Sequence, residues 1–143
     1  MPRFVLLYHN CPPGYVRSSH WDVMLETGGE LETWALAQLP RAWHVAHELT
    51  KLACPNCPPL SAGDTISTEH LAAHRLAYLD YEGPVSKGRG NVVRIAAGTY
   101  ASELQHDGCM RIRFDEGPLS SVVTLQRAAP DENVAWLLTY CEA

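Results

Sequence analysis

Short apolar segments separated by turn residues constrain the fold of this chain more than any other feature of its sequence. A β-prone segment at residues 4–8 precedes a loop that contains Pro12-Pro13-Gly14, and alternating segments at 21–26 and 31–36 flank Gly28-Gly29. Further strand candidates lie at residues 91–96, 99–104, 109–114, 119–127 and 134–140. We therefore predict a mostly β fold: a compact, closed or partly open barrel of about six to eight mainly antiparallel strands with one or two short helices.

The middle of the chain, residues 41–79, differs from the rest because it is rich in Ala, Leu and His and is interrupted by a loop rich in Pro and Gly. Within it, residues 67–79 have the composition of a short helix, with Ser67 or Thr68 as the N-cap. We predict that this segment is helical.

Length and charge limit the kind of partner that the protein can have. With 143 residues, 46% of them hydrophobic, the chain is expected to form one domain over residues 1–143. The formal net charge of −5 disfavours a protein that coats DNA non-specifically, because such binding neutralises many phosphates. A local phosphate site is compatible with this charge, since Lys87, Arg89 and Arg94 fall in a stretch without acidic residues.

Cysteine content and the first residues predict the compartment. No apolar run has the length of a membrane-spanning helix, and the segment at residues 4–8 is too short for a signal-peptide core. The five cysteines are an odd number and favour reduced thiols over a disulfide scaffold. We therefore expect a cytoplasmic protein with no membrane partner.

Three polar residues form a candidate metal site. In the strand that contains residues 21–26, alternation places His20, Asp22 and Met24 on one face, and the opposite, core-facing side carries Trp21, Val23 and Leu25. His20 and Asp22 are then about 7 Å apart along the strand and can converge on one ion. His9, at the end of the first strand, completes two imidazoles and one carboxylate, for which manganese, zinc and iron are all chemically plausible. Polar residues on a solvated face are the alternative interpretation.

A second candidate segment runs from His74 to Gly90. His74 and Tyr78 share a face if residues 67–79 are helical. Three glycines between residues 83 and 90 alternate with Lys87 and Arg89, which suits an anion cradle as well as a plain hairpin turn. Cys54 and Cys57 resemble half of a zinc site, but a second pair with matching spacing does not occur in the sequence, which favours a loop with two thiols.

The order of these motifs resembles the phosphoesterase domain of bacterial DNA ligase D. The similarity spans nearly the whole chain except about residues 41–68. The motifs that carry it are His9 and His20-x-Asp22 followed by Leu31-x-x-Trp34-Ala35-Leu36, then His74-x-x-x-Tyr78-x-Asp80-Tyr81-Glu82-Gly83, Gly98-Thr99-Tyr100, Gly117-x-Leu119-Ser120 and Trp136-Leu137-Leu138.

The resemblance implies a β-barrel that binds manganese, with zinc as an alternative, and removes phosphates or ribonucleotides from DNA 3′ ends. It implies that His9, His20 and Asp22 are the metal ligands and that His74 and Tyr78 are the catalytic residues at the scissile phosphate. We expect 3′-phosphate removal or phosphodiester cleavage, on DNA 3′ ends or another phosphate ester, and recruitment by a repair ligase or polymerase.

Two positions depart from the family pattern. The family has an arginine where this chain has Met24 and a lysine near Gln38, and a methionine cannot contact a phosphate as a guanidinium does. The candidate replacements for phosphate binding are Arg75, Lys87 and Arg89, with Arg17 as a weaker one. The alternative function is a catalytically inactive module that holds a metal and the phosphate of a nucleic-acid end.

Overall fold

Nine β-strands, one α-helix and one 3-10 helix make up the described part of the chain. The computed structural model describes residues 2–15, 18–48, 65–85, 88–106, 108–115, 119–129 and 134–141. The elements in chain order are β1 Arg3–Asn10, β2 His20–Thr27, β3 Glu30–Leu36, α1 Arg41–Glu48, β4 Thr65–His74, η1 Leu76–Leu79, β5 Gly83–Pro84, β6 Asn91–His106, β7 Cys109–Phe114, β8 Ser121–Arg127 and β9 Ala135–Cys141.

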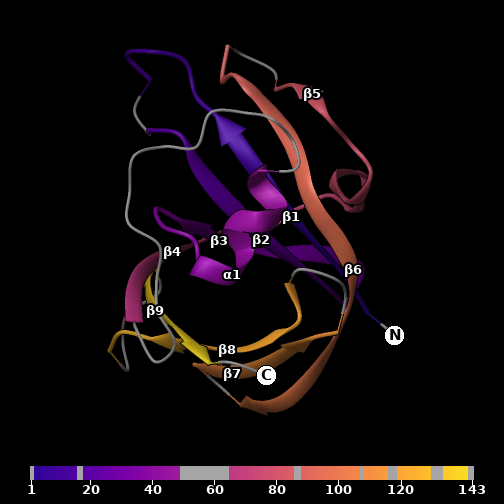
Figure 1. Ribbon diagram of the computed structural model, residues 1–143, viewed down its shortest axis with the longest axis vertical. Helices are drawn as coiled ribbons and strands as arrows, with labels where there is room; N and C mark the ends of the chain where they lie inside the picture. The colour runs from indigo at the N-terminus through magenta and orange to yellow at the C-terminus, as the bar shows by residue number, and fades with distance from the viewer. Residues whose placement is uncertain are drawn as a thin grey trace.

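Eight of these strands close into an antiparallel barrel, as predicted. The strand order is β1-β2-β3-β4-β9-β8-β7-β6, and β6 pairs with β1 to close the ring, while β5 pairs with β6 as an additional strand (Figure 1). The β2–β3 hairpin turns at Gly28 and Gly29, whose φ angles of 59° and 87° match the turn that a tight hairpin needs.

The barrel interior holds the main hydrophobic core, and α1 packs into this core. Trp21, Val23 and Leu25 point inward, as the alternation predicted. In Figure 1, α1 lies between the β1–β3 side and the β7–β9 side of the barrel. Trp43 donates its indole N–H to Ser121 at 3.1 Å, and His47 accepts the indole N–H of Trp21 at 3.1 Å. The helix therefore links the two sides of the barrel.

The prediction of a helix over residues 67–79 was wrong. Residues 65–74 form β4, which pairs with β3 on one side and β9 on the other, and only residues 76–79 are helical. Ile66 and Thr68 are buried at alternate positions. Pairing with two neighbouring strands satisfies the backbone and completes the barrel, which outweighs a weak local helix preference. In the described part of this region, the α-helix is α1, at Arg41–Glu48.

The strand candidates at residues 91–96 and 99–104 are not separated by a turn at Gly98, because residues 91–106 form one 16-residue strand. The first half of β6 pairs with β1 and the second half pairs with β7. Register shifts between Leu6 and Leu7 and between Ser102 and Leu104 accompany this change of partner. β6 therefore bends around the barrel, as its long curve in Figure 1 shows.

A second hydrophobic cluster covers the outer face of β1, β2 and β3. Its buried members are Val5, Leu7, Met24, Leu31, Leu79 and Val92. Leu79 belongs to η1, and the partly buried Val85 follows β5. This cluster attaches the segment at residues 76–85 to the barrel wall, next to the strands that carry the candidate site.

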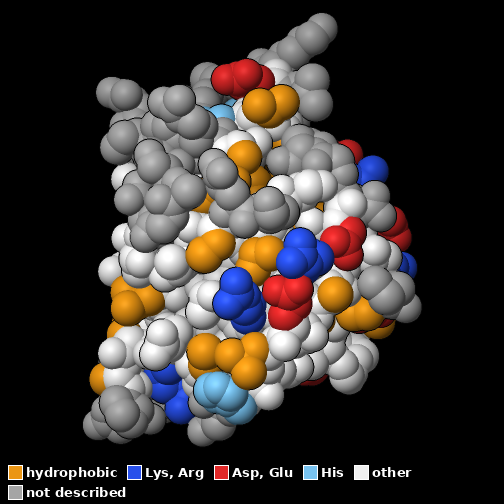
Figure 2. Space-filling model, turned by 60° about the horizontal axis from the view of Figure 1, so that its bottom comes forward, with side chains coloured by type: hydrophobic (Ala, Val, Ile, Leu, Met, Phe, Trp, Pro, Cys, Tyr) orange, Lys and Arg blue, Asp and Glu red, His pale blue; other side chains and the backbone are white. Residues whose placement is uncertain are grey.

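The surface shown in Figure 2 mixes basic and acidic side chains instead of presenting one broad basic area. Charges of opposite sign also form ion pairs between β6 and β7: Glu103 pairs with both Arg113 and Arg111, at 2.9 Å and 3.6 Å. Among the described residues, no helix combines the length and the apolar character that crossing a membrane requires.

Candidate metal centre

The ends of β1 and β2 bring the two predicted imidazole ligands together. His9 lies directly opposite His20 in the antiparallel register, and the ring centroids are 5.0 Å apart. Alternation along β2 places Asp22 on the same outer face, where its neighbour on β1 is Leu7. His20, Asp22 and Met24 share this face, as predicted.

Two backbone carbonyls orient the imidazole rings. Nε2 of His9 is 2.7 Å from the carbonyl oxygen of Arg89, and Nδ1 of His20 is 2.9 Å from that of Ser18. Because a carbonyl oxygen only accepts hydrogen bonds, these two nitrogens carry the protons. In the neutral rings, Nδ1 of His9 and Nε2 of His20 therefore carry lone pairs. Metal-bound histidines in proteins are oriented in the same way.

The contact between His20 and Asp22 fits a bound cation. Nε2 of His20 lies 3.2 Å from Oδ1 of Asp22, and the side chains are only 9% and 5% exposed. Oδ1 of Asp22 is buried and accepts no hydrogen bond from any described residue. Two acceptors at this distance repel unless a proton or a cation lies between them. If a nitrogen and an oxygen both bind one ion at about 2.1 Å, with an angle of about 100° at the ion, they lie about 3.2 Å apart. The observed distance between His20 and Asp22 is the same.

The electrostatics of His9 favour the neutral ring that a metal needs. Burial is the main cause that lowers the pKa of His9, and the charges of His20 and Arg89 act in the same direction. The hydrogen bond to Arg89 and the charge of Asp22 oppose this shift without cancelling it. A lower pKa keeps the Nδ1 lone pair available at neutral pH.

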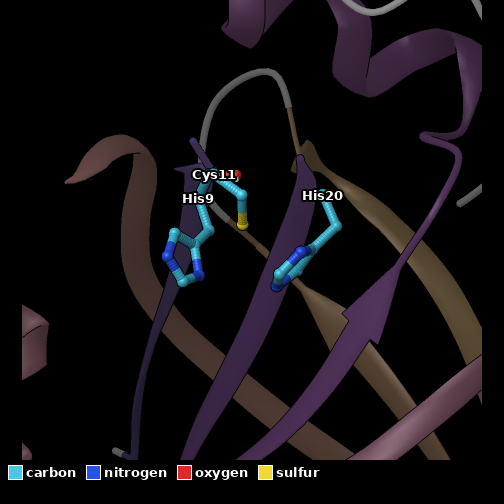
Figure 3. A group of neighbouring side chains, drawn as sticks. All are labelled: His9, Cys11 and His20. Carbon is cyan, nitrogen blue, oxygen red and sulfur yellow. Dashed lines mark hydrogen bonds between the residues drawn. The ribbon is translucent and has the colours of Figure 1, made fainter. Parts of the chain in front are cut away.

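Cys11 is a neighbour of both histidines that sequence reasoning did not assign to this site. One ligand atom from each of His9, Cys11 and His20 lies within 4.8 Å of the others. Figure 3 shows the Cys11 sulfur between the two rings. The His9-x-Cys11 spacing was the available signal, because residues two apart in an extended chain point to the same side.

His74 and Tyr78 form a second polar group on the outer face. Their rings are perpendicular and 5.5 Å apart, although His74 ends β4 and Tyr78 lies in η1. Thr33 donates its hydroxyl proton to the Leu31 carbonyl at 3.0 Å and lies 3.0 Å from Nδ1 of His74. Since that single proton is already used, Nδ1 of His74 is the donor to Thr33, and Nε2 of the neutral ring carries a lone pair.

The sheet register separates these two groups. His74 lies opposite Leu31, which lies opposite Glu26, four residues along β2 from Asp22. Residues that pair across neighbouring strands form a row. The row that contains Asp22 is thus about 13 Å, along the strand direction, from the row that contains His74. Met24, 1% exposed, occupies the row between them.

The three phosphate-binding candidates have different positions. Arg89 is half-buried beside His9, whose ring it contacts through its carbonyl oxygen. Arg75 is exposed, and the cavity of about 270 Å³ next to η1 is lined by Arg75, Ala77, Tyr78, Tyr81, Pro84 and Val85. Lys87, Arg17, Cys54 and Cys57 lie outside the described residues.

Two histidines that the sequence left without a role are structural. His47 is buried in the core and accepts a hydrogen bond from Trp21. His70 stacks on Trp34 with a centroid distance of 4.7 Å and pairs with Glu32 at 3.2 Å. Their partners lie on other elements of the fold, so no local sequence pattern predicts these contacts.

Comparison with known proteins adds no relative to this description. No protein-family model matches the chain, and no curated protein matches it. The ligase D resemblance therefore stays a prediction, and the case for a function depends on the geometry of the outer face.

Proposed function

We propose that this chain is a metal-dependent phosphoesterase that acts on DNA 3′ ends in DNA repair. The observation that carries the proposal is the buried pair of His20 and Asp22, 3.2 Å apart, with His9 beside it. The motif order supports the choice of substrate. A repair ligase or polymerase is a suitable partner because both require a 3′-hydroxyl. We also propose a cytoplasmic location, in keeping with the thiol state of Cys11, Cys109 and Cys141.

The residues at the ends of β1 and β2 have complementary roles in this proposal. His9 and His20 hold the cation through their lone pairs, and the Asp22 carboxylate offsets its charge. When bound, a divalent ion polarises a phosphoryl oxygen and neutralises the charge that develops on it. Arg89, beside His9, supplies a further positive charge for the phosphate.

His74 and Tyr78 bind the DNA strand that leads to the scissile ester. The row of residues that contains His74 lies about 13 Å along the β-strands from that of Asp22, so the Nε2 lone pair of His74 contacts a neighbouring part of this DNA strand and not a phosphate oxygen on the cation. Thr33 fixes the ring orientation through Nδ1. Tyr78, perpendicular to that ring, contacts the same part of the DNA strand.

Met24 favours a second candidate function, a module that binds the metal and a phosphate without turnover. This side chain is buried in the outer cluster with Val5 and Leu79 and leaves no cation at that position. Loss of one contact between an arginine and the phosphate in a phosphoryl-transfer site costs on the order of 3 kcal/mol of transition-state stabilisation. Arg89 is the compensating charge if the enzyme is active.

A gel assay of a 3′-phosphate primer-template distinguishes the two functions. Wild type and His20→Ala are compared with manganese and, separately, with zinc, and His106→Ala is the matched control because His106 is exposed on β6, away from this site. We expect metal-dependent conversion to a 3′-hydroxyl that falls at least about 100-fold in His20→Ala and not in the control.

Three other outcomes decide against a phosphoesterase that depends on this metal centre. Conversion without added metal, or conversion unchanged in His20→Ala, refutes the metal-dependent phosphoesterase. No conversion in the wild type, with a cation still bound through His20, assigns the binding module.

A further inference from the structure

We propose that Cys11 is a thiolate ligand of the same cation and makes the site selective for zinc over manganese. This inference rests on the metal centre of the proposed function, but it does not depend on the phosphoesterase reaction. It concerns a residue that lies two positions after His9, in the loop that follows β1.

Proximity is the first observation. The candidate ligand atoms of His9, Cys11 and His20 all lie within 4.8 Å of one another. Tetrahedral ligands about 2.0–2.3 Å from zinc are about 3.5 Å apart, so each pair of the three atoms needs to close by at most about 1.3 Å. The Cys11 sulfur lies between the two rings in Figure 3 and needs no change of side to reach the ion.

The second observation is that the backbone around Cys11 is anchored to both strands. The Cys11 N–H donates to the Ser19 hydroxyl at 3.0 Å, and that hydroxyl is 3.3 Å from the Asn10 amide oxygen. The thiol contacts the His9 carbonyl oxygen at 3.8 Å. These contacts connect the end of β1 to the start of β2 and hold Cys11 next to His20.

The chemistry of the donor set then decides the metal. Manganese prefers oxygen ligands, whereas a thiolate with two imidazoles suits zinc. Two imidazoles, one thiolate and the Asp22 carboxylate give a neutral complex with a divalent ion. This set fills four positions, so a phosphate oxygen enters only by displacing Asp22 or by adding a fifth ligand.

Cobalt substitution tests the thiolate directly. The full chain in a Cys54→Ser/Cys57→Ser background is stripped of metal and titrated with Co²⁺, and the thiolate-to-cobalt charge-transfer band in the near ultraviolet is recorded. Cys11→Ser is compared with Cys109→Ser, whose thiol lies on β7. We expect the band in the background chain and in Cys109→Ser and its loss in Cys11→Ser. We also expect zinc affinity to fall at least about tenfold in Cys11→Ser, with little change for manganese.

A band of unchanged intensity in Cys11→Ser, or equal zinc affinity in both chains, overturns the proposal. If Cys11→Ser does not fold, alkylation of the background chain replaces it. Zinc should slow modification of the Cys11 peptide, measured by mass spectrometry, and an equal rate with and without zinc refutes ligation. If the 3′-phosphate assay fails but the cobalt band persists, the phosphoesterase proposal is refuted and the Cys11 proposal stands.

Discussion

Gly90 packs so closely against the backbone of Asn10 that a Cβ on Gly90 would overlap the Asn10 carbonyl oxygen. Its φ of +89° also lies in the region that favours glycine. The preceding residue, Arg89, provides the carbonyl oxygen that orients His9. Contact between Gly90 and Asn10 therefore helps to set the direction of the proposed metal ligand His9, which is 80 residues from Arg89 in the sequence.

Gly90→Ala should weaken metal binding because the methyl group displaces the Arg89 carbonyl from His9. The matched control is Gly88→Ala, which has a φ of +65° but no atom within 4 Å of its Cβ position. Both variants carry backbone strain of about 1 kcal/mol. We expect zinc affinity to fall about tenfold or more in Gly90→Ala only, as measured by titration calorimetry. Equal losses in the two variants would show that strain alone is responsible.

Metal should stabilise the fold because His20 and Asp22 are buried at 3.2 Å from each other. A ligand at 100 times its dissociation constant adds about 2.7 kcal/mol to the free energy of unfolding. For a domain of this size we expect a rise in Tm of about 5–10 °C by scanning fluorimetry, reversed by EDTA. The rise should be absent in Asp22→Ala. A rise of the same size in that variant would place the ion elsewhere.

Introducing by Met24→Arg the arginine that the ligase D pattern has at this position should destabilise the protein. Met24 is 1% exposed in an apolar cluster, and burying an unpaired guanidinium there costs about 3 kcal/mol or more of unfolding free energy. Met24→Leu is the volume-matched control and should cost less than about 1.5 kcal/mol. Urea unfolding measures both. A stable Met24→Arg with increased 3′-phosphatase activity would contradict this prediction and show that the outer cluster rearranges around the guanidinium.

Acid should lower the stability of the metal-free protein. Burial is the main cause that lowers the pKa of both His9 and His44 in the folded state. The unfolded chain therefore takes up protons first, and the stabilisation present above about pH 6.5 is lost as pH falls below that value.

Urea unfolding in EDTA at pH 7.5 and 5.5 measures this loss. His44→Gln should reduce the difference in unfolding free energy between the two pH values. The pKa of Glu26 is lowered by its hydrogen bonds with Arg3, so this carboxyl titrates below about pH 4.5, outside this window. A pH-independent free energy of unfolding in this range would contradict the prediction.

Features that depend on neighbouring residues could be predicted from the sequence alone. Alternation along residues 20–26 assigned Trp21 and Val23 to the core and His20 and Asp22 to the other face. Gly28-Gly29 located the hairpin, and the close spacing of turns predicted the barrel. These features follow from the two-residue period of a strand and from the conformations open to glycine, both of which are local properties.

Features that depend on contacts between distant segments could not be predicted from the sequence and emerged from the folded chain. Residues 65–74 became β4 because two separate strands supply its hydrogen bonds, and β6 runs through Gly98 because it has different partners on its two halves. The approach of Gly90 to Asn10 and the burial of Met24 and Leu79 in one cluster likewise join segments far apart in the chain. Cys11 is close to His20 only because β1 and β2 pair in one register. Such pairings cannot be predicted from the local sequence. Their free energy comes from packing and from backbone hydrogen bonds that exist only once the barrel has closed.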